Sequence, residues 1–309
     1  PDADCVGAAL GIYRLSKTLG KSTYIVMDKD CPAIEPIVEG IYKERAEEEE
    51  DIFVTNEEAL LLKDKSAMLI VVDVNLPAMT ECPELLKSVS TIVVLDHHRQ
   101  NNETIKNAVV SYVEPYASST CEMVAEILQY IVDKPKLKNI EADAMYSGIL
   151  VDTDNFVIKA GVRTFEAAAF LRRAGADVTR VRKMFREDME HCRIRTAIIN
   201  KAEIYMDEFA ISTFDGANVS GATVVGAKAA NALLNIQGIR GSFVLTSLQD
   251  CIYISARSID ELNVQVIMEK FNGGGHLTMA AAQLKNVTLE EAKQQLEDVL
   301  QQMREDGDI

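Results

Sequence analysis

Two continuous apolar runs in the first half of the chain constrain its fold more than any other feature. Met68–Val72 and Thr91–Leu95 contain no charged residue. Such runs are typical of parallel strands buried on both faces, since crossover helices cover a sheet of this kind. Helical periodicity precedes them at Gly7–Leu19 and follows them at Thr120–Val132 and Ile140–Leu150. We therefore expect an α/β fold whose parallel sheet has helices on both faces.

Local signals predict further elements in this half. Tyr24–Met27 is expected to be a short strand. Ser119 with Glu122 three residues later matches a capping box at the start of a helix. Thr164 is expected to cap the next helix, which would run to Arg173 and end before Gly175.

The second half begins with a charged helical stretch at residues 178–202 that contains no turn signal, and we predict one connecting helix there. We place the first domain at residues 1–190 and the second, smaller α/β domain with its linker helix at residues 191–309. The elements expected in it are strands at Glu203–Phe214, Ser242–Ser247, Cys251–Ala256 and Met279–Leu284, and helices at Ala222–Leu234, Glu261–Phe271 and Leu289–Arg304.

The composition narrows the class of protein and its partners. The chain has 309 residues, of which 48% are hydrophobic and 26% charged, as in a soluble globular protein with a core. Its formal net charge of −16 argues against a long nucleic acid as a partner, because duplex binders carry a basic footprint. The six cysteines form no CxxC pair, which favours reduced thiols in the cytoplasm.

The chemically informative residues lie where strands end. Asp73 directly follows the first apolar run, and Asp96, His97 and His98 directly follow the second. Ligands of open α/β sheets bind outside the carboxyl ends of the strands. A single Asp at such a place is usually a turn or cap residue, yet two of the four histidines of the chain stand at this one position.

Further aspartates stand at element ends. Asp2 and Asp4 precede the first predicted helix, and Asp152 and Asp154 follow another. Carboxylates gathered in one cleft stay ionised only if cations compensate their charge. Oxygen-rich sites with one or two imidazoles suit Mn²⁺ or Mg²⁺ better than structural zinc. Two such ions about 3.5–4 Å apart form the clamp used in phosphodiester cleavage. Asp2 and Asp4 alone would equally be read as helix caps.

In this order the motifs resemble those of the DHH phosphoesterases along nearly the whole chain. The motifs that carry the resemblance are Pro1–Ala8, Val71–Asp73, Asp96–His98, Val151–Thr153, Ile254–Ser258 and Gly273–His276. Within that superfamily, three stretches are similar to cyclic di-AMP phosphodiesterases of the GdpP type: Glu114–Thr120, Gly161–Ala167 and Gly275–Thr278.

The resemblance implies two Mn²⁺ ions per active site, with Mg²⁺ or Co²⁺ as alternatives. The implied metal ligands are Asp2, Asp4, Asp73, His97 and Asp152. Asp73 would bridge the two ions. His98 would lie beside the phosphate, and Asp96 would orient the histidines. The family also places a metal-binding histidine and a strand shortly before the Pro1–Asp4 stretch, outside this sequence.

In the second domain the resemblance implies substrate-binding residues. Gly273, Gly274 and Gly275 would let a ligand approach the backbone closely. Arg257 and His276 would donate hydrogen bonds to a phosphate. A glycine run alone is more often a turn, and its reading as a binding element depends on the first domain. We expect the active site in a cleft between the two domains.

The implied reaction is hydrolysis of cyclic di-AMP to the linear 5′-phosphorylated di-adenylate by a metal-bound hydroxide. The alternative is a short-oligonucleotide exonuclease (nanoRNase) that also dephosphorylates 3′,5′-bisphosphate nucleotides. The charge disfavours a RecJ-like exonuclease on long strands. A nucleotide-binding sensor that has lost catalysis would have other residues in place of the metal ligands, whereas every ligand position within this sequence is occupied. The Gly-Gly-Gly-His element argues against a pyrophosphatase.

The expected partner is a small cyclic dinucleotide or a short linear oligonucleotide, with no long nucleic acid. This part of the chain is expected to be cytoplasmic and without membrane contact, while GdpP-type proteins imply a membrane anchor upstream of it. The sequence leaves open whether the protein forms a homodimer.

Overall fold

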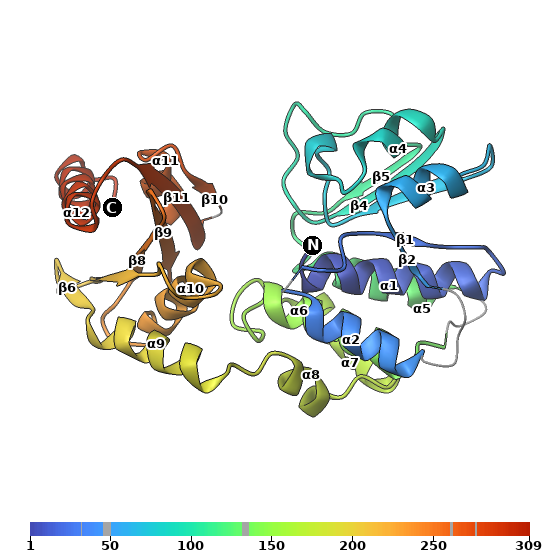
Figure 1. Cartoon of the computed structure of the whole chain (residues 1–309), viewed down its shortest axis with the longest axis horizontal. Coiled ribbons are helices and arrows are strands. Elements are labelled where there is room, and N and C mark those ends of the chain that lie inside the picture. The colour runs from blue at the N-terminus through green and yellow to red at the C-terminus, as the bar shows by residue number, and fades with distance from the viewer. Residues whose placement is uncertain (32, 46–50, 132–135, 260–261, 276) are drawn as a thin grey trace. The chain divides into compact units, whose positions relative to one another are not determined.

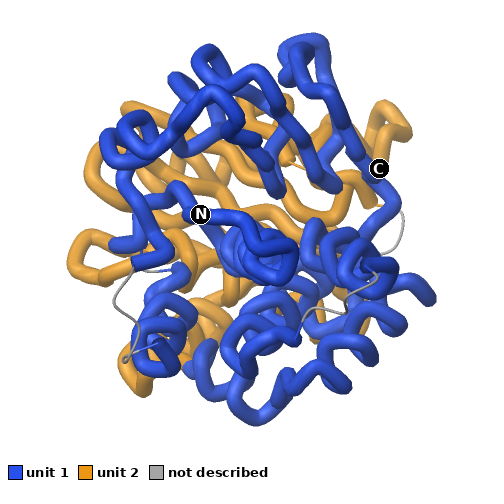
Figure 2. Tube along the Cα trace, turned by 90° about the vertical axis from the view of Figure 1, so that its right-hand side faces the viewer, with its two compact units in different colours: residues 1–186 blue, residues 187–309 orange. Residues whose placement is uncertain are grey.

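The computed structural model describes residues 1–31, 33–45, 51–131, 136–259, 262–275 and 277–309. The chain divides into two compact units, residues 1–186 and residues 187–309, which Figure 2 shows in two colours. The sequence analysis placed its division after residue 190. Among the described residues, every helix is too short or too polar to span a bilayer.

Unit 1 is built on parallel strands (Figure 1). Its larger sheet has the order β3-β4-β5 and its smaller one pairs β1 with β2. The strands are β1 (Ile25–Val26), β2 (Phe53–Val54), β3 (Met68–Val72), β4 (Thr91–Asp96) and β5 (Val110–Val113). The two apolar runs are therefore neighbours, paired from Met68 with Thr91 to Val72 with Leu95. The sequence analysis missed β2 and β5, which are too short to show a pattern.

Helices cover both faces of this sheet. They are α1 (Ala3–Thr18), α2 (Glu35–Glu44), α3 (Asn56–Leu62), α4 (Pro83–Ser88), α5 (Thr120–Tyr130), α6 (Asn139–Asp152), α7 (Val162–Arg173) and α8 (Val178–Met184), with a short 3₁₀ turn at Pro77–Met79. Ile92 and Val94 of β4 share a core cluster with Leu86 of α4. Leu95 clusters with Val124 of α5 on the other face. The predicted α/β class is confirmed, because alternate residues of one strand enter different cores.

Polar side chains decide where several helices begin. Asp2 accepts a hydrogen bond from the backbone N–H of Cys5, so α1 begins at Ala3, four residues before the predicted start. Ser119 caps α5 as predicted. The prediction that Thr164 caps α7 is wrong, because that helix already begins at Val162. The hydroxyl of Thr164 instead accepts from the backbone N–H of Gly161.

The predicted single connecting helix is wrong. The segment forms α8 (Val178–Met184) and α9 (Met189–Asn200), with an irregular stretch between them. Asp177 and Asp188 each accept a hydrogen bond from the backbone N–H three residues later. Aspartate at such a position starts a new helix, and this signal outweighs the uninterrupted helical composition.

Unit 2 contains one mixed sheet in the order β10-β11-β9-β8-β7-β6. Its strands are β6 (Glu203–Tyr205), β7 (Phe209–Asp215), β8 (Gly241–Leu248), β9 (Cys251–Ser258), β10 (Gly274–Gly275) and β11 (Met279–Lys285). The predicted strand at Glu203–Phe214 is two antiparallel strands, because Met206 and Asp207 adopt positive φ values of 52° and 63° and turn the chain back. The strands predicted at Ser242–Ser247 and Cys251–Ala256 are confirmed as β8 and β9, which form an antiparallel hairpin.

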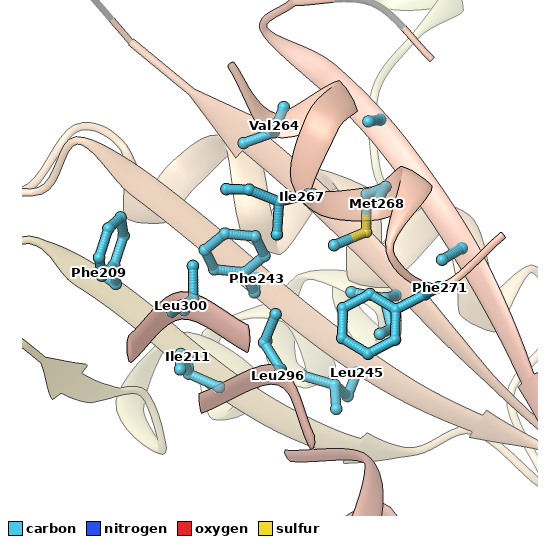
Figure 3. Close-up of a cluster of buried hydrophobic side chains, with 14 of the residues drawn as sticks. Phe209, Ile211, Phe243, Leu245, Val264, Ile267, Met268, Phe271, Leu296 and Leu300 are labelled. Atoms are coloured by element: carbon cyan, nitrogen blue, oxygen red, sulfur yellow. The ribbon is translucent and has the colours of Figure 1, made fainter. Parts of the chain in front are cut away.

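Helices also lie on both faces of the sheet of unit 2. They are α9, α10 (Ala222–Leu233), α11 (Val264–Glu269) and α12 (Leu289–Asp306). One face packs against α11 and α12, where Phe243, Ile267 and Leu296 are fully buried (Figure 3). The other face packs against α10 and α9 through Ala229 and Val244.

Close packing of α1 on α6 depends on Gly7. A Cβ atom added there would lie 2.7 Å from the carbonyl oxygen of Ala144 and 2.9 Å from the Cα of Met145. Both are backbone atoms of α6, so neither can move aside without shifting the helix. The helix that carries Asp4 is thereby held against the helix that carries Asp152.

We predict that Gly7→Ala lowers the free energy of unfolding of the chain by roughly 1–3 kcal/mol, the usual cost of overpacking. Helix propensity alone would raise it by about 1 kcal/mol. Urea titration measures the change. Gly40→Ala in α2 is the matched control, because its Cβ would meet only side-chain atoms, the nearest being Cδ1 of Ile140 at 2.5 Å, and these can move aside. An increase in stability for Gly7→Ala would contradict the packing argument.

Candidate functional site

The carboxyl ends of β3 and β4 bring the predicted site residues of unit 1 together. Asp73 follows β3 directly, and its backbone N–H donates to the carbonyl of Leu95. Its φ of 63° lies in the left-handed region, which aspartate tolerates better than most residues. Asp96 ends β4, and His97 and His98 come next. Parallel pairing therefore places one carboxylate and two imidazoles at the same edge of the sheet.

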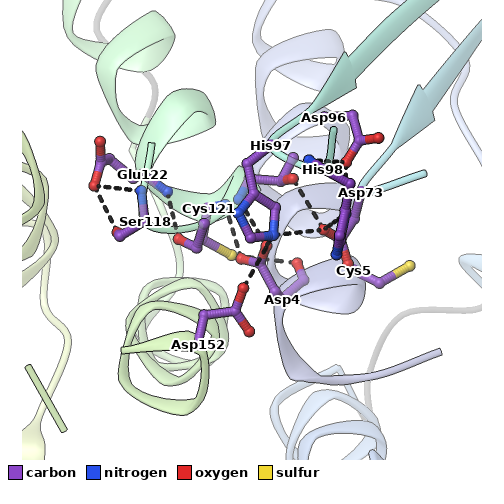
Figure 4. A network of polar contacts seen from close by, with 12 residues as sticks. Asp4, Cys5, Asp73, Asp96, His97, His98, Ser118, Cys121, Glu122 and Asp152 are labelled. Atoms are coloured by element: carbon purple, nitrogen blue, oxygen red, sulfur yellow. Dashed lines mark hydrogen bonds and ion pairs between the residues drawn. The ribbon is translucent and has the colours of Figure 1, made fainter. Parts of the chain in front are cut away.

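His97 is the centre of this arrangement (Figure 4). Its Nε2 atom lies 3.1 Å from an oxygen of Asp152, 3.5 Å from one of Asp73 and 4.0 Å from one of Asp4. The ring is buried, and Nε2 has no hydrogen-bond partner among the described residues. An imidazole nitrogen that faces three carboxylates without a hydrogen bond fits a cation better than it fits a core histidine.

Two sets of side chains have the spacing of a metal site. In each set, one potential ligand atom per residue lies within 4.8 Å of the others. The first set is Asp73, His97 and His98, and the second is Asp4, His97 and Asp152. They share His97 and otherwise come from four different stretches of the chain.

Asp4 is fully buried and is held by the beginning of α5. Its two carboxylate oxygens accept hydrogen bonds from the backbone N–H groups of Thr120 and Cys121, at 2.6 and 2.8 Å. The hydroxyl of Thr120 donates to Asp73 at 3.0 Å. One helix terminus thus orients carboxylates from α1 and from the end of β3. The positive end of a helix also stabilises negative charge.

The pKa shifts of the site residues indicate that the site lacks positive charge. Burial raises the pKa of Asp73 well above its usual range, and the nearby charge of Asp4 raises it further. Burial and the charge of Asp152 raise the pKa of Asp4 as well. Burial lowers the pKa of His97, but its contact with Asp152 and the charge of Asp4 outweigh this and raise it. These carboxylates would be ionised together at neutral pH only with added positive charge, which divalent ions supply.

Asp96 holds His98 from behind. This fully buried carboxylate accepts from the Nδ1 atom of His98 at 2.8 Å and from its backbone N–H at 3.1 Å. It also accepts from the side-chain amide of Asn75 at 2.5 Å. Asp96 therefore has the geometry needed to orient His98, which is the role predicted for it from the sequence. His98 keeps 43% of its side-chain area exposed, which suits a group that meets a ligand.

Asp2 differs from the other predicted ligands. Its carboxylate caps α1, and it belongs to neither set of potential ligands among the described residues. The sequence analysis missed Thr120 and Asn75, which support the site from behind. Asn75 could have been suspected as the second residue after Asp73, but Thr120 carries no local signal, because its role depends on where α5 packs.

In unit 2, Arg257 and the glycine run belong to the same sheet, on strands that are separated by one further strand. Arg257 is in β9, directly paired with Met279 of β11, and β11 pairs in turn with Gly274 and Gly275. Gly273 directly precedes β10, and His276 lies outside the described residues. Three of the predicted substrate-binding residues, Arg257, Gly274 and Gly275, therefore lie in one sheet, with β11 between their strands.

The glycines differ in what they require. A Cβ at Gly273 would lie 2.2 Å from the carbonyl oxygen of Ala281, and one at Gly275, where φ is +149°, would lie 2.4 Å from that of Met279. Close contact with β11 therefore accounts for these two glycines without a ligand. Gly274 has open space around its Cα, so it is the position in the run where a ligand can reach the backbone.

Comparison with known proteins places both units. Residues 1–149 match the model of the DHH family, N-terminal domain, and residues 211–305 match that of the DHHA1 domain. The cyclic-di-AMP phosphodiesterase PdeA of Listeria monocytogenes serotype 1/2a (strain 10403S) is 42% identical over 299 residues. That match covers 96% of this chain and 45% of the relative, so the chain spans less than half of its length.

Solved structures show the same fold. An exopolyphosphatase-related protein from Bacteroides fragilis has a TM-score of 0.79 at 20% identity, covering 98% of this chain and 89% of that one. The exonuclease RecJ bound to manganese has a TM-score of 0.50 at 16% identity, covering 96% of this chain and 87% of that one. With both domain models matched in order and the DHH motif at the edge of the parallel sheet, this chain belongs to the DHH family and carries a DHH domain followed by a DHHA1 domain.

Proposed function

We propose that this chain hydrolyses a phosphodiester bond of cyclic di-AMP at a centre of two divalent metal ions, with Mn²⁺ as the favoured ion. The observation that carries the proposal is the buried Nε2 atom of His97, which faces three carboxylates without a hydrogen-bond partner among the described residues. Carboxylate oxygens with one or two imidazoles are ligands that suit Mn²⁺. RecJ, of the same fold, has been solved with manganese bound.

Asp4, Asp73, His97 and Asp152 would hold the ions. Asp2 would join them only by giving up its bond to the N–H of Cys5. When bound, divalent ions supply a nucleophile at neutral pH and neutralise charge on the phosphoryl oxygens. Asp96 fixes the ring of His98 through Nδ1. His98 then presents a partly exposed imidazole beside Asp73, 3.7 Å from its carboxylate, where it donates a hydrogen bond to a substrate phosphate.

Unit 2 supplies substrate binding in this proposal. Arg257 offers a planar group whose geometry fits phosphate oxygens. Gly274 exposes backbone on which a ligand can lie. The choice of cyclic di-AMP rests on the named activity of PdeA, which is 42% identical over 96% of this chain. The first product would be the linear dinucleotide with a 5′-phosphate, and short linear oligonucleotides are the competing substrates.

The test of this function is a comparison of substrates with and without metal. Because the ligands are mostly oxygen, chelation should abolish hydrolysis of cyclic di-AMP, and Mn²⁺ should restore it better than Zn²⁺. Chromatography of the products measures both effects. Full activity in excess chelator, with no metal retained, would contradict the metal centre. Faster turnover of a linear dinucleotide than of cyclic di-AMP would favour the exonuclease alternative.

The variant Asp73→Asn tests the metal ligands with the backbone preserved. Asparagine tolerates the positive φ of residue 73, whereas alanine would add strain. Removal of the charge should lower both Mn²⁺ content and turnover, the latter by on the order of 100-fold or more, since even supporting residues of metal sites cost 10–100-fold. Elemental analysis of the dialysed protein gives the metal content.

Asp154→Asn is the matched control for this experiment. Asp154 is exposed, also has a positive φ, of 45°, and belongs to neither set of potential ligands. Its substitution should change neither metal content nor turnover. Two ions per chain in Asp73→Asn would reject the bridging role of Asp73.

Arg257→Ala should weaken substrate binding by roughly 1.5–3 kcal/mol, the range for a hydrogen bond to a charged group. Arg257→Lys keeps the charge but loses the planar guanidinium group. Its affinity should therefore lie between those of the unmodified protein and Arg257→Ala. Calorimetry with a non-hydrolysable phosphorothioate analogue of cyclic di-AMP measures the affinity. Lys285→Ala, which removes an exposed charge at the end of β11, should bind normally. Normal binding by Arg257→Ala would confine substrate recognition to other residues.

A further inference from the structure

Asn231 connects helix α10 to the proposed phosphate-binding arginine. It lies in α10, and its side-chain oxygen accepts a hydrogen bond from the Nε atom of Arg257 in β9, at 2.7 Å. The Nη1 atom of Arg257 also donates to the carbonyl of Ala256, at 2.9 Å. Two acceptors, one on a helix and one on a strand backbone, therefore hold the same guanidinium group.

Arg257 lies on the more exposed face of β9 and β11. In β9 and β11, Ile254, Ala256, Ala280 and Ala282 are buried in the core against α11 and α12. The alternate residues Arg257 and Met279 are only partly buried, and Ala281 is exposed. Because side chains alternate along a strand, these residues share the opposite face, on which α10 also packs. Asn231 thus approaches Arg257 from the edge of α10, where the covered part of the face gives way to the exposed part.

The hydrogen bond to Nε restricts the orientation of the guanidinium group of Arg257. A guanidinium group is planar, so a hydrogen bond at Nε together with one at Nη1 fixes the orientation of that plane. A mobile arginine side chain loses conformational entropy when it is ordered. Ordering it before the ligand arrives removes much of that cost from binding.

We infer that Asn231 is a positioning residue, which orients the guanidinium of Arg257 to receive a phosphate group of the substrate. The inference rests on the proposed function, because it requires Arg257 to bind that phosphate. It adds a residue of α10 to the binding apparatus of unit 2. Asn231 itself would not touch the ligand.

A double-mutant cycle on the full chain tests this, with calorimetry of the phosphorothioate analogue of cyclic di-AMP as the readout. Asn231→Ala should weaken binding roughly 3- to 10-fold, the equivalent of one hydrogen bond. In the Arg257→Ala background the same substitution should have no further effect, because nothing remains to be positioned. Asn231→Asp keeps an acceptor for Nε and should bind within about 3-fold of the unmodified protein.

Asn235→Ala is the matched control, an exposed asparagine just after the same helix, and it should bind normally. The unfolding midpoint and the metal content should be the same in all variants. Normal binding by Asn231→Ala, together with weakened binding by Arg257→Ala, would overturn the inference alone. Equal losses from Asn231→Ala in both backgrounds would also overturn it, since Asn231 would then contact the ligand directly. Normal binding by Arg257→Ala would overturn the proposed role of Arg257, and the inference with it.

Discussion

The in-register parallel pairing of β3 with β4 is the constraint on which the rest of unit 1 depends. Because Val72 is level with Leu95, Asp73 and the Asp96–His98 stretch leave the sheet at one edge. A register shifted by one residue would turn the side chains of one strand to the opposite face. The apolar side chains of β4, which enter different cores on the two faces, oppose such a shift.

Around that edge, the helices act as holders of carboxylates. The first turn of α5 binds Asp4 through two backbone N–H groups and Asp73 through the hydroxyl of Thr120. Asp152 is the last residue of α6, which α1 contacts through Gly7. Buried carboxylates normally repel one another strongly enough to become protonated. Burial and mutual repulsion raise the pKa values of Asp4 and Asp73, and bound cations would offset that repulsion.

Unit 2 differs from unit 1 in the groups that its sheet carries. Its sheet carries Arg257 on β9 and the glycine run at β10, with β11 between them. Two of the three glycines are explained by close contact with β11, which leaves Gly274 as the position open to a ligand. The local geometry thus distinguishes the glycines of one motif, since close packing requires Gly273 and Gly275 whereas Gly274 has open space around it.

The sequence by itself determined the α/β class, the two apolar strands of the sheet and the residues that follow them, because apolar runs and strand-end polar residues are local signals. It did not determine the break before Asp188 or the turn at Met206, where a few backbone conformations outweigh composition over a longer window. Only the tertiary structure decided that Asp2 caps a helix while Asp4, two residues later, faces His97, and that Thr120, Asn75 and Asn231 support the functional groups. Such roles arise from contacts between elements far apart in the chain, and no local pattern in the sequence records them.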